Sequence, residues 1–189
     1  RSTLRGYLVK DINGDLDVKL GTSVLSEELI KKVSSGKVCR ITVMGQGTAA
    51  IAAQAVAAAI DEQISSSDIR VDSQLATELS GFGLRSDMSD TCIIAISQSG
   101  TTTDTNRTVD LVQARGAHVV AIVNRRNSDL ADRADGVFYT SDGRDIEMSV
   151  ASTKAFYAQV TAGFLLAVSL FKALPNKRSF GYQELLEGL

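Results

Sequence analysis

The chain has 189 residues, enough for one well-buried core and few for two separate domains. Its 20 lysines and arginines nearly balance 22 aspartates and glutamates, so the formal net charge at pH 7 is only -2. This balance gives no sign of a nucleic acid or an anionic membrane as partner. Cys39 and Cys92 lack the spacing of a zinc site or a disulfide framework, and we expect both to be buried thiols in a reducing cytosol.

The first 22 residues are expected to form a linker segment ahead of a domain that spans residues 23–175. Within the linker, Asn13-Gly14 separates two short apolar stretches, and this dipeptide is typical of a two-residue β-hairpin turn. Residues 176–189 would begin a further linker or segment, because the chain starts without methionine and ends just after an amphipathic stretch. Both ends therefore suggest a piece of a longer protein.

Strands and helices are predicted to alternate through the domain. Short β-branched runs predict the strands, and the segments between them have the apolar spacing or the alanine content of helices. The expected strands are residues 38–44, 69–71, 91–96, 117–123 and 136–139, and the expected helices are residues 23–33, 49–63, 75–79, 102 onward, 128–133 and 151–174. The alternation predicts an α/β fold, a three-layer αβα sandwich with a five-stranded parallel sheet of flavodoxin-like order 2-1-3-4-5.

The stretch TCIIAISQSGTTTDT, residues 91–105, carries the strongest chemical signal. A buried strand ends in Ser97-Gln98-Ser99-Gly100 and a helix begins near Thr102, so hydroxyl groups gather where a helix presents unpaired backbone N–H groups. The positive end of the helix dipole faces the same point, which suits a phosphate dianion. No lysine or arginine occurs between residues 91 and 106, so neutral donors would hold the anion. The same hydroxyls could serve only as caps and turn formers.

Two segments resemble the SIS (sugar isomerase) domain family. SQSGTTTDT, residues 97–105, resembles the family's phosphate loop, S-x-S-G-x-T-x-D-T, and EMSVASTKAF, residues 147–156, resembles a second family segment. One departure is Thr101, where the family often has an acid. The likeness spans residues 39–174 and is greatest to the first SIS domain in the isomerase half of the glucosamine-6-phosphate synthases.

The resemblance implies a domain that binds a hexose 6-phosphate, either fructose 6-phosphate or glucosamine 6-phosphate. The parent reaction would make glucosamine 6-phosphate from fructose 6-phosphate and glutamine-derived ammonia, with no metal or other cofactor. The substrate contacts implied in this chain are Gly47, Thr48, Ser97, Gln98, Ser99, Thr102, Val150 and Ser152. The family's Cys-Gly-Thr-Ser-like loop after the first strand is matched by residues 46–49, where Gln46 and Ala49 depart from it. The family also has a short, mostly helical segment before the domain, which competes with the hairpin.

The chain lacks a clear catalytic base for sugar isomerisation, which needs a proton-shuttling group and a ring-opening group. His118 starts its strand at the end opposite the ligand edge, so we expect a structural role. Glu147 is a second-choice base, and Lys154 is expected to be structural. The resemblance implies that the catalytic groups come from a second SIS domain, the tail or a neighbouring subunit. This chain would then bind substrate without converting it.

Two other functions stay open. Gly45-x-Gly47-x-x-Ala50 after the first strand matches a dinucleotide-binding fingerprint, with Asp72 as a candidate ribose ligand. The other alternative is a non-catalytic SIS domain that senses a sugar phosphate for a regulatory partner.

The last predicted helix, residues 151–174, is apolar nearly all round. Surplus apolar surface of this kind predicts an interface, so we expect a homodimer or pairing with a second SIS domain through this helix. No membrane span is expected, because the charge-free windows 41–60 and 155–171 are interrupted by a Gly-Gln-Gly break and by polar residues.

Overall fold

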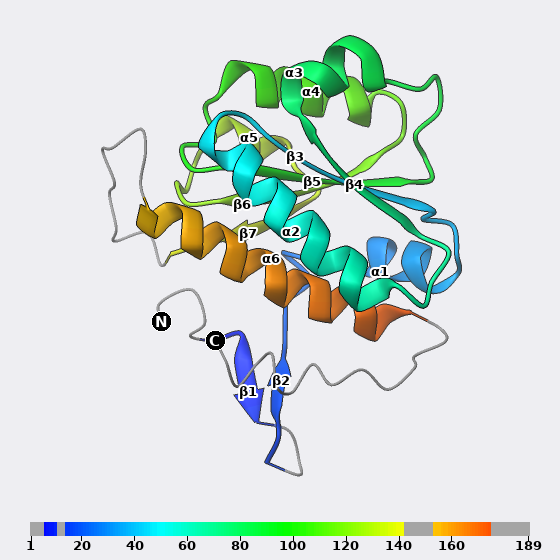
Figure 1. Cartoon of the computed structure of the whole chain (residues 1–189), viewed down its shortest axis with the longest axis vertical. Coiled ribbons are helices and arrows are strands. Elements are labelled where there is room, and N and C mark those ends of the chain that lie inside the picture. The colour runs from blue at the N-terminus through cyan, green and yellow to red at the C-terminus, as the bar shows by residue number, and fades with distance from the viewer. Residues whose placement is uncertain (1–5, 11–13, 142–152, 175–189) are drawn as a thin grey trace.

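The computed structural model describes residues 6–10, 14–141 and 153–174. Their elements follow one another as shown in Figure 1. In chain order these are β1 (Leu8–Lys10), β2 (Leu16–Val18), α1 (Glu27–Ser34), β3 (Arg40–Gly45), α2 (Thr48–Ile64), β4 (Arg70–Leu75), α3 (Ala76–Glu78), the π-helical turn η1 (Leu79–Gly83), β5 (Thr91–Ser97), α4 (Thr103–Gln113), β6 (His118–Val123), α5 (Asp129–Arg133), β7 (Gly136–Tyr139) and α6 (Thr153–Ala173).

The main sheet has five strands in the order β4-β3-β5-β6-β7, and every neighbouring pair is parallel. This is the predicted order 2-1-3-4-5, and the three-layer α/β fold is confirmed. Helices α1, α2 and α6 cover one face of the sheet, and α3, α4 and α5 cover the other (Figure 1). The central strands β5 and β6 are buried along their whole length, which explains their uninterrupted apolar sequences.

Helices α2 and α6 pack closely side by side on one face of the sheet (Figure 1). A Cβ atom placed on Gly163 would collide with the side chain of Val56, so the helices can approach this closely only because residue 163 is glycine. Helix α6 is long and apolar enough to cross a membrane by length and composition, yet 56% of its most apolar window is buried inside the domain. Its composition is therefore accounted for by its place in the core.

The N-terminal residues differ from the helical segment that the family resemblance implied. Strands β1 and β2 pair antiparallel, with Leu8 opposite Val18 and Lys10 opposite Leu16. The hairpin interpretation is therefore correct, and the helical interpretation is wrong for these strands. The connection is longer than the two-residue turn that Asn13-Gly14 suggested, because β1 ends at Lys10 and β2 begins at Leu16.

Two predicted helix boundaries were also wrong. Helix α1 begins at Glu27 instead of residue 23, because Ser26 is the N-cap and its Oγ accepts a hydrogen bond from Leu29 N at 3.1 Å. The helix expected over residues 75–79 begins later, at Ala76, and continues through the turn η1 to Gly83, past the glycine expected to stop it.

The two cysteines lie in different environments. Cys92 in β5 is buried as expected, and burial raises the pKa of its thiol to about 12. Cys39 precedes β3 and is exposed, so the prediction of a buried thiol was wrong at this position.

His118 lies at the amino-terminal edge of the sheet, where β6 begins. Its side chain is only 7% exposed, with Nδ1 3.9 Å from Asp135 Oδ2 and Nε2 3.4 Å from Ser26 Oγ. Burial lowers the pKa of His118, and the nearby Asp135 carboxylate partly opposes this shift. The folded protein therefore favours the neutral imidazole.

Acid is accordingly expected to destabilise the fold through His118. Because the pKa is lower in the folded protein than in the unfolded chain, the unfolded chain binds the proton first. The stability that the neutral His118 contributes is complete above the pKa of histidine in the unfolded chain, about 6.5. It is lost as the pH falls through the lower pKa of His118 in the folded protein. Denaturant unfolding measured between about pH 8 and pH 5 should show this loss, and His118→Asn should flatten it. An equal slope in both proteins would assign the effect to other groups.

Candidate functional site

Two polar loops leave the same edge of the sheet because β3 and β5 are parallel neighbours. Met44 of β3 lies opposite Ala95 of β5, so the two strands end at nearly the same level. The chain then continues into α2 on one face and α4 on the other. In open α/β sheets, ligands bind at the carboxyl ends of strands whose connections diverge in this way. We call this region, made by residues 45–48 and 97–106, the carboxyl-edge site.

The loop between β3 and α2 depends on two glycines. A Cβ atom on Gly45 would lie 2.6 Å from the backbone C and O atoms of Ala49, so this glycine lets α2 begin directly against the strand. Gly47 is the N-cap of α2 with φ +60°, and no side chain caps the helix there. Thr48 follows as the first helical residue and is exposed. Close packing at Gly45 and the positive φ at Gly47 thus account for the two glycines of the pattern that resembled a dinucleotide fingerprint.

The loop between β5 and α4 is held by its own serines. Ser97 ends β5 and is 3% exposed, and its Oγ accepts a hydrogen bond from Gly100 N at 3.0 Å. Ser99 Oγ accepts hydrogen bonds from Thr101 N at 3.2 Å and from Thr101 Oγ1 at 3.0 Å. Gly100 has φ +67°, and a Cβ atom there would collide with the side chain of Ser128, so this position requires glycine.

Thr102 is the N-cap of α4, in agreement with the helix start predicted near this residue, but its hydroxyl makes no capping hydrogen bond. Its carbonyl oxygen accepts from Asn106 N at 3.0 Å, which closes the first turn. The side chain is half-buried. The start of α4 therefore keeps backbone N–H groups that no side-chain cap satisfies, next to the hydroxyl of Thr102.

A third loop, between β6 and α5, supports the second one. Asn124 N and Arg125 N both donate to Gln98 O at 3.2 Å, and Leu130 N donates to Gly100 O at 3.0 Å. The guanidinium carbon of Arg126 lies 4.5 Å from the ring centroid of Tyr139. No sequence pattern pointed to this loop, because its residues are more than twenty positions away from Gln98 and nothing local signals the contact.

Three buried side-chain oxygens at this edge have no hydrogen-bond partner in the described structure. They are Gln46 Oε1, Thr105 Oγ1 and Asn106 Oδ1. Thr105 is 1% and Asn106 6% exposed, and Asn106 Nδ2 donates to Gly100 O at 3.1 Å. Buried polar atoms are normally paired, so a group of unpaired oxygens points to a partner that the described residues do not supply.

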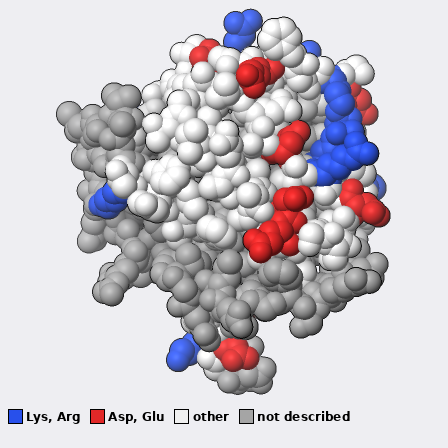
Figure 2. All heavy atoms as spheres, in the orientation of Figure 1, with Lys and Arg blue, Asp and Glu red and all other residues white. Residues whose placement is uncertain are grey.

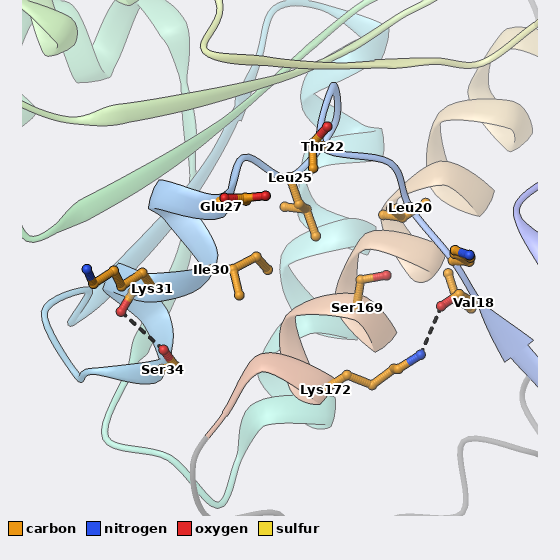
Figure 3. A pocket seen from close by; sticks show the side chains of 11 residues that line it. Val18, Leu20, Thr22, Leu25, Glu27, Ile30, Lys31, Ser34, Ser169 and Lys172 are labelled. Carbon is orange, nitrogen blue, oxygen red and sulfur yellow. Dashed lines mark hydrogen bonds between the residues drawn. The ribbon is translucent and has the colours of Figure 1, made fainter.

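A groove of about 540 Å³ lies elsewhere, between α1, α6 and the segment after β2 (Figure 3). Leu20, Leu25 and Ile30 line it, and Lys172 on its rim donates to Val18 O and to both carboxylate oxygens of Asp17. None of the unpaired buried atoms found in the described residues belongs to its lining. The carboxyl-edge site therefore differs from this groove in having buried polar atoms without a hydrogen-bond partner among the described residues.

The other sequence candidates fall into two groups. Val150, Ser152 and Glu147 lie outside the described residues. Asp72 lies within β4, which continues to Leu75, and it accepts a hydrogen bond from Gln74 Nε2 at 3.3 Å. It therefore does not end the strand, as a ribose ligand of the dinucleotide fold would. Among the described residues, no group of three or more His, Cys, Asp and Glu side chains could hold a metal ion.

The sequence model of one protein family, described as SIS domain, matches residues 36–169. The chain belongs to the SIS domain family. It is 37% identical over 191 aligned positions to the glutamine–fructose-6-phosphate aminotransferase (isomerizing) of Corynebacterium glutamicum, an alignment that covers the whole chain and 28% of that relative. The chain thus spans little more than a quarter of the curated relative.

Solved structures support the fold. The C-terminal domain of glucosamine-fructose-6-phosphate aminotransferase from Francisella tularensis matches with a TM-score of 0.67 at 22% identity, over 87% of this chain and 42% of that one. Glucosamine-6-phosphate deaminase from Thermotoga maritima matches with a TM-score of 0.62 at 17% identity, over 85% of this chain and 47% of that one.

The loop geometry predicts different effects for its two serines. Ser97→Ala removes the acceptor of the buried Gly100 N–H, and an unsatisfied buried donor costs about 1–3 kcal/mol of folding free energy. Ser99→Ala removes an acceptor from the exposed residue Thr101, which water can replace, so its cost should be below about 0.5 kcal/mol. Denaturant unfolding of both variants measures the difference. Equal losses would contradict the assigned hydrogen bonds.

Proposed function

We propose that the carboxyl-edge site binds a hexose 6-phosphate, either fructose 6-phosphate or glucosamine 6-phosphate. The start of α4 carries the proposal, because Thr102 leaves it without a side-chain cap. A phosphate dianion there would accept hydrogen bonds from backbone N–H groups and from the hydroxyls of Ser97, Ser99 and Thr102. Gly47 and Thr48 at the uncapped start of α2 would contact the sugar from the α2 side of the site.

The chain would act within a larger enzyme. We propose that it is the sugar-phosphate-binding part of a cytoplasmic, isomerising glutamine–fructose-6-phosphate aminotransferase, since a curated relative with that name aligns over the full chain. That relative is more than three times longer, so it has ample room for further domains. The groups that move protons between sugar carbons would come from those domains, and Glu147 remains the second choice in this chain.

Titration calorimetry with fructose 6-phosphate tests the site. Ser99→Ala should weaken binding about 10- to 150-fold, because hydrogen bonds to charged groups contribute about 1.5–3 kcal/mol. Ser65→Ala is a matched control, since Ser65 is an exposed serine whose hydroxyl donates to Glu62 O at 2.9 Å, outside the site. A coupled assay for glucose 6-phosphate on the same samples should stay at background.

Several results would contradict this proposal. If a folded Ser99→Ala variant bound fructose 6-phosphate with unchanged affinity, the loop would only cap the helix and would not bind the phosphate. Binding of NAD in place of hexose phosphate would favour the dinucleotide alternative. Turnover by the unmodified chain, abolished by Glu147→Gln, would mean that the domain carries its own base.

A second proposal concerns the outer face of α2 and α6, where we place a dimer interface with a second copy of this chain. Ile51 and Tyr157 on this face are 54% and 64% exposed, and the centre of the face is free of charged atoms in Figure 2. A contact with a second copy across a two-fold axis would bury both exposed side chains.

Light scattering on the purified chain should accordingly show a dimer. Ile51→Glu should convert it to a monomer, because a charge within an apolar interface would be buried without a partner. Phe82→Glu is the control, since Phe82 is 94% exposed and lies in η1, on the α4 side of the sheet. A monomer at high concentration, or equal effects of both substitutions, would contradict this interface.

A further inference from the structure

We infer that Gln46 binds the hydroxyl-bearing part of the sugar phosphate and so helps to determine which sugar the domain accepts. This inference rests on the proposed function. Gln46 is the first residue after β3, in one of the two loops that form the carboxyl-edge site. It is one of the two positions where the chain departs from the family's loop pattern, and its role is not implied by the resemblance.

The alternation of side chains along β3 shows which face of the sheet each residue before Gln46 occupies. Val43 belongs to the core beneath α2 and α6, and Met44 belongs to the core on the α4 side. Gly45 faces α2 again, as shown by the contact that a Cβ atom would make with Ala49. Gln46 follows in a bend outside the strand, and its buried Oε1 shows that the end of the side chain is turned away from solvent. The first turn of α4, with Thr105 and Asn106, follows the neighbouring strand β5 at the same edge of the sheet.

The chemistry of the unpaired atoms selects the part of the ligand. Gln46 Oε1 is buried and unpartnered, and a carboxamide oxygen only accepts hydrogen bonds. The dianion of a phosphate monoester has only acceptors, so the phosphate group of a sugar phosphate cannot satisfy this oxygen, whereas a sugar hydroxyl or a protonated amine can. Asn106 Oδ1 needs a donor in the same way, because Nδ2 of that side chain already donates to Gly100 O.

The carboxyl-edge site therefore offers two kinds of group. The uncapped start of α4 supplies donors for an anion, and Gln46 and Asn106 supply acceptors for hydroxyls. A molecule that carries both a phosphate and hydroxyl groups matches this arrangement, which a free phosphate would satisfy only in part. Discrimination against a ligand without the hydroxyl follows, because the buried oxygen would then stay unpaired.

Gln46→Met tests the inference, because methionine has a similar length and no comparable acceptor. Calorimetry would use fructose 6-phosphate and inorganic phosphate as separate probes. We expect the variant to bind fructose 6-phosphate roughly 2- to 13-fold more weakly and inorganic phosphate with unchanged affinity. Its melting temperature should be equal or higher, since the free protein loses an unpaired buried oxygen. Gln54→Met, on the exposed face of α2, is the matched control and should change neither affinity.

The outcomes distinguish failure of the inference from failure of the proposed function. If Gln46→Met leaves fructose 6-phosphate binding unchanged, or weakens both probes equally, Gln46 does not bind the sugar. A lower melting temperature with unchanged affinities would show instead a structural role for the carboxamide. If the unmodified chain binds neither probe, the proposed function fails first, and the inference fails with it.

Discussion

The parallel pairing of β3 with β5 is the constraint on which the rest of the domain depends. It brings two segments about fifty residues apart in sequence to the same edge of the sheet, and the following helices then separate to opposite faces. Such a junction works only if the backbone can turn tightly at the strand ends. Gly45 and Gly100 meet this demand, since a side chain at either position would collide with the neighbouring segment.

The central part of the fold was predictable from local sequence because its strands are buried on both faces. Each of β3, β5 and β6 has an almost continuous apolar run, and the run ends where the strand ends. The edge strand β4 was predicted too short, because Asp72, Ser73 and Gln74 continue the pairing with β3 without an apolar pattern. At the N-terminus, the turn-forming dipeptide Asn13-Gly14 correctly predicted a hairpin, whereas the family resemblance implied a mostly helical segment.

The site was predictable only where its chemistry is local. Ser97, Ser99 and Thr102 occur within six consecutive residues, and their arrangement between strand and helix is visible in the sequence. The support from Asn124 and Arg125 arises only when β6 pairs with β5, so no local pattern signals it. Gln46 attracted notice only as a departure from a family pattern, and its unpaired oxygen is a property of the folded chain that the sequence does not show.

The contrast between the two cysteines makes the domain suitable for chemical labelling. The thiolate is the form that reacts with alkylating reagents, and Cys92 is both buried and kept protonated by its high pKa. Cys39 is exposed at the amino-terminal edge, directly before β3 and at the opposite end of that strand from Gly45. A fluorophore attached to this native thiol would leave the carboxyl-edge site untouched, so the natural sequence already contains a position for an optical reporter.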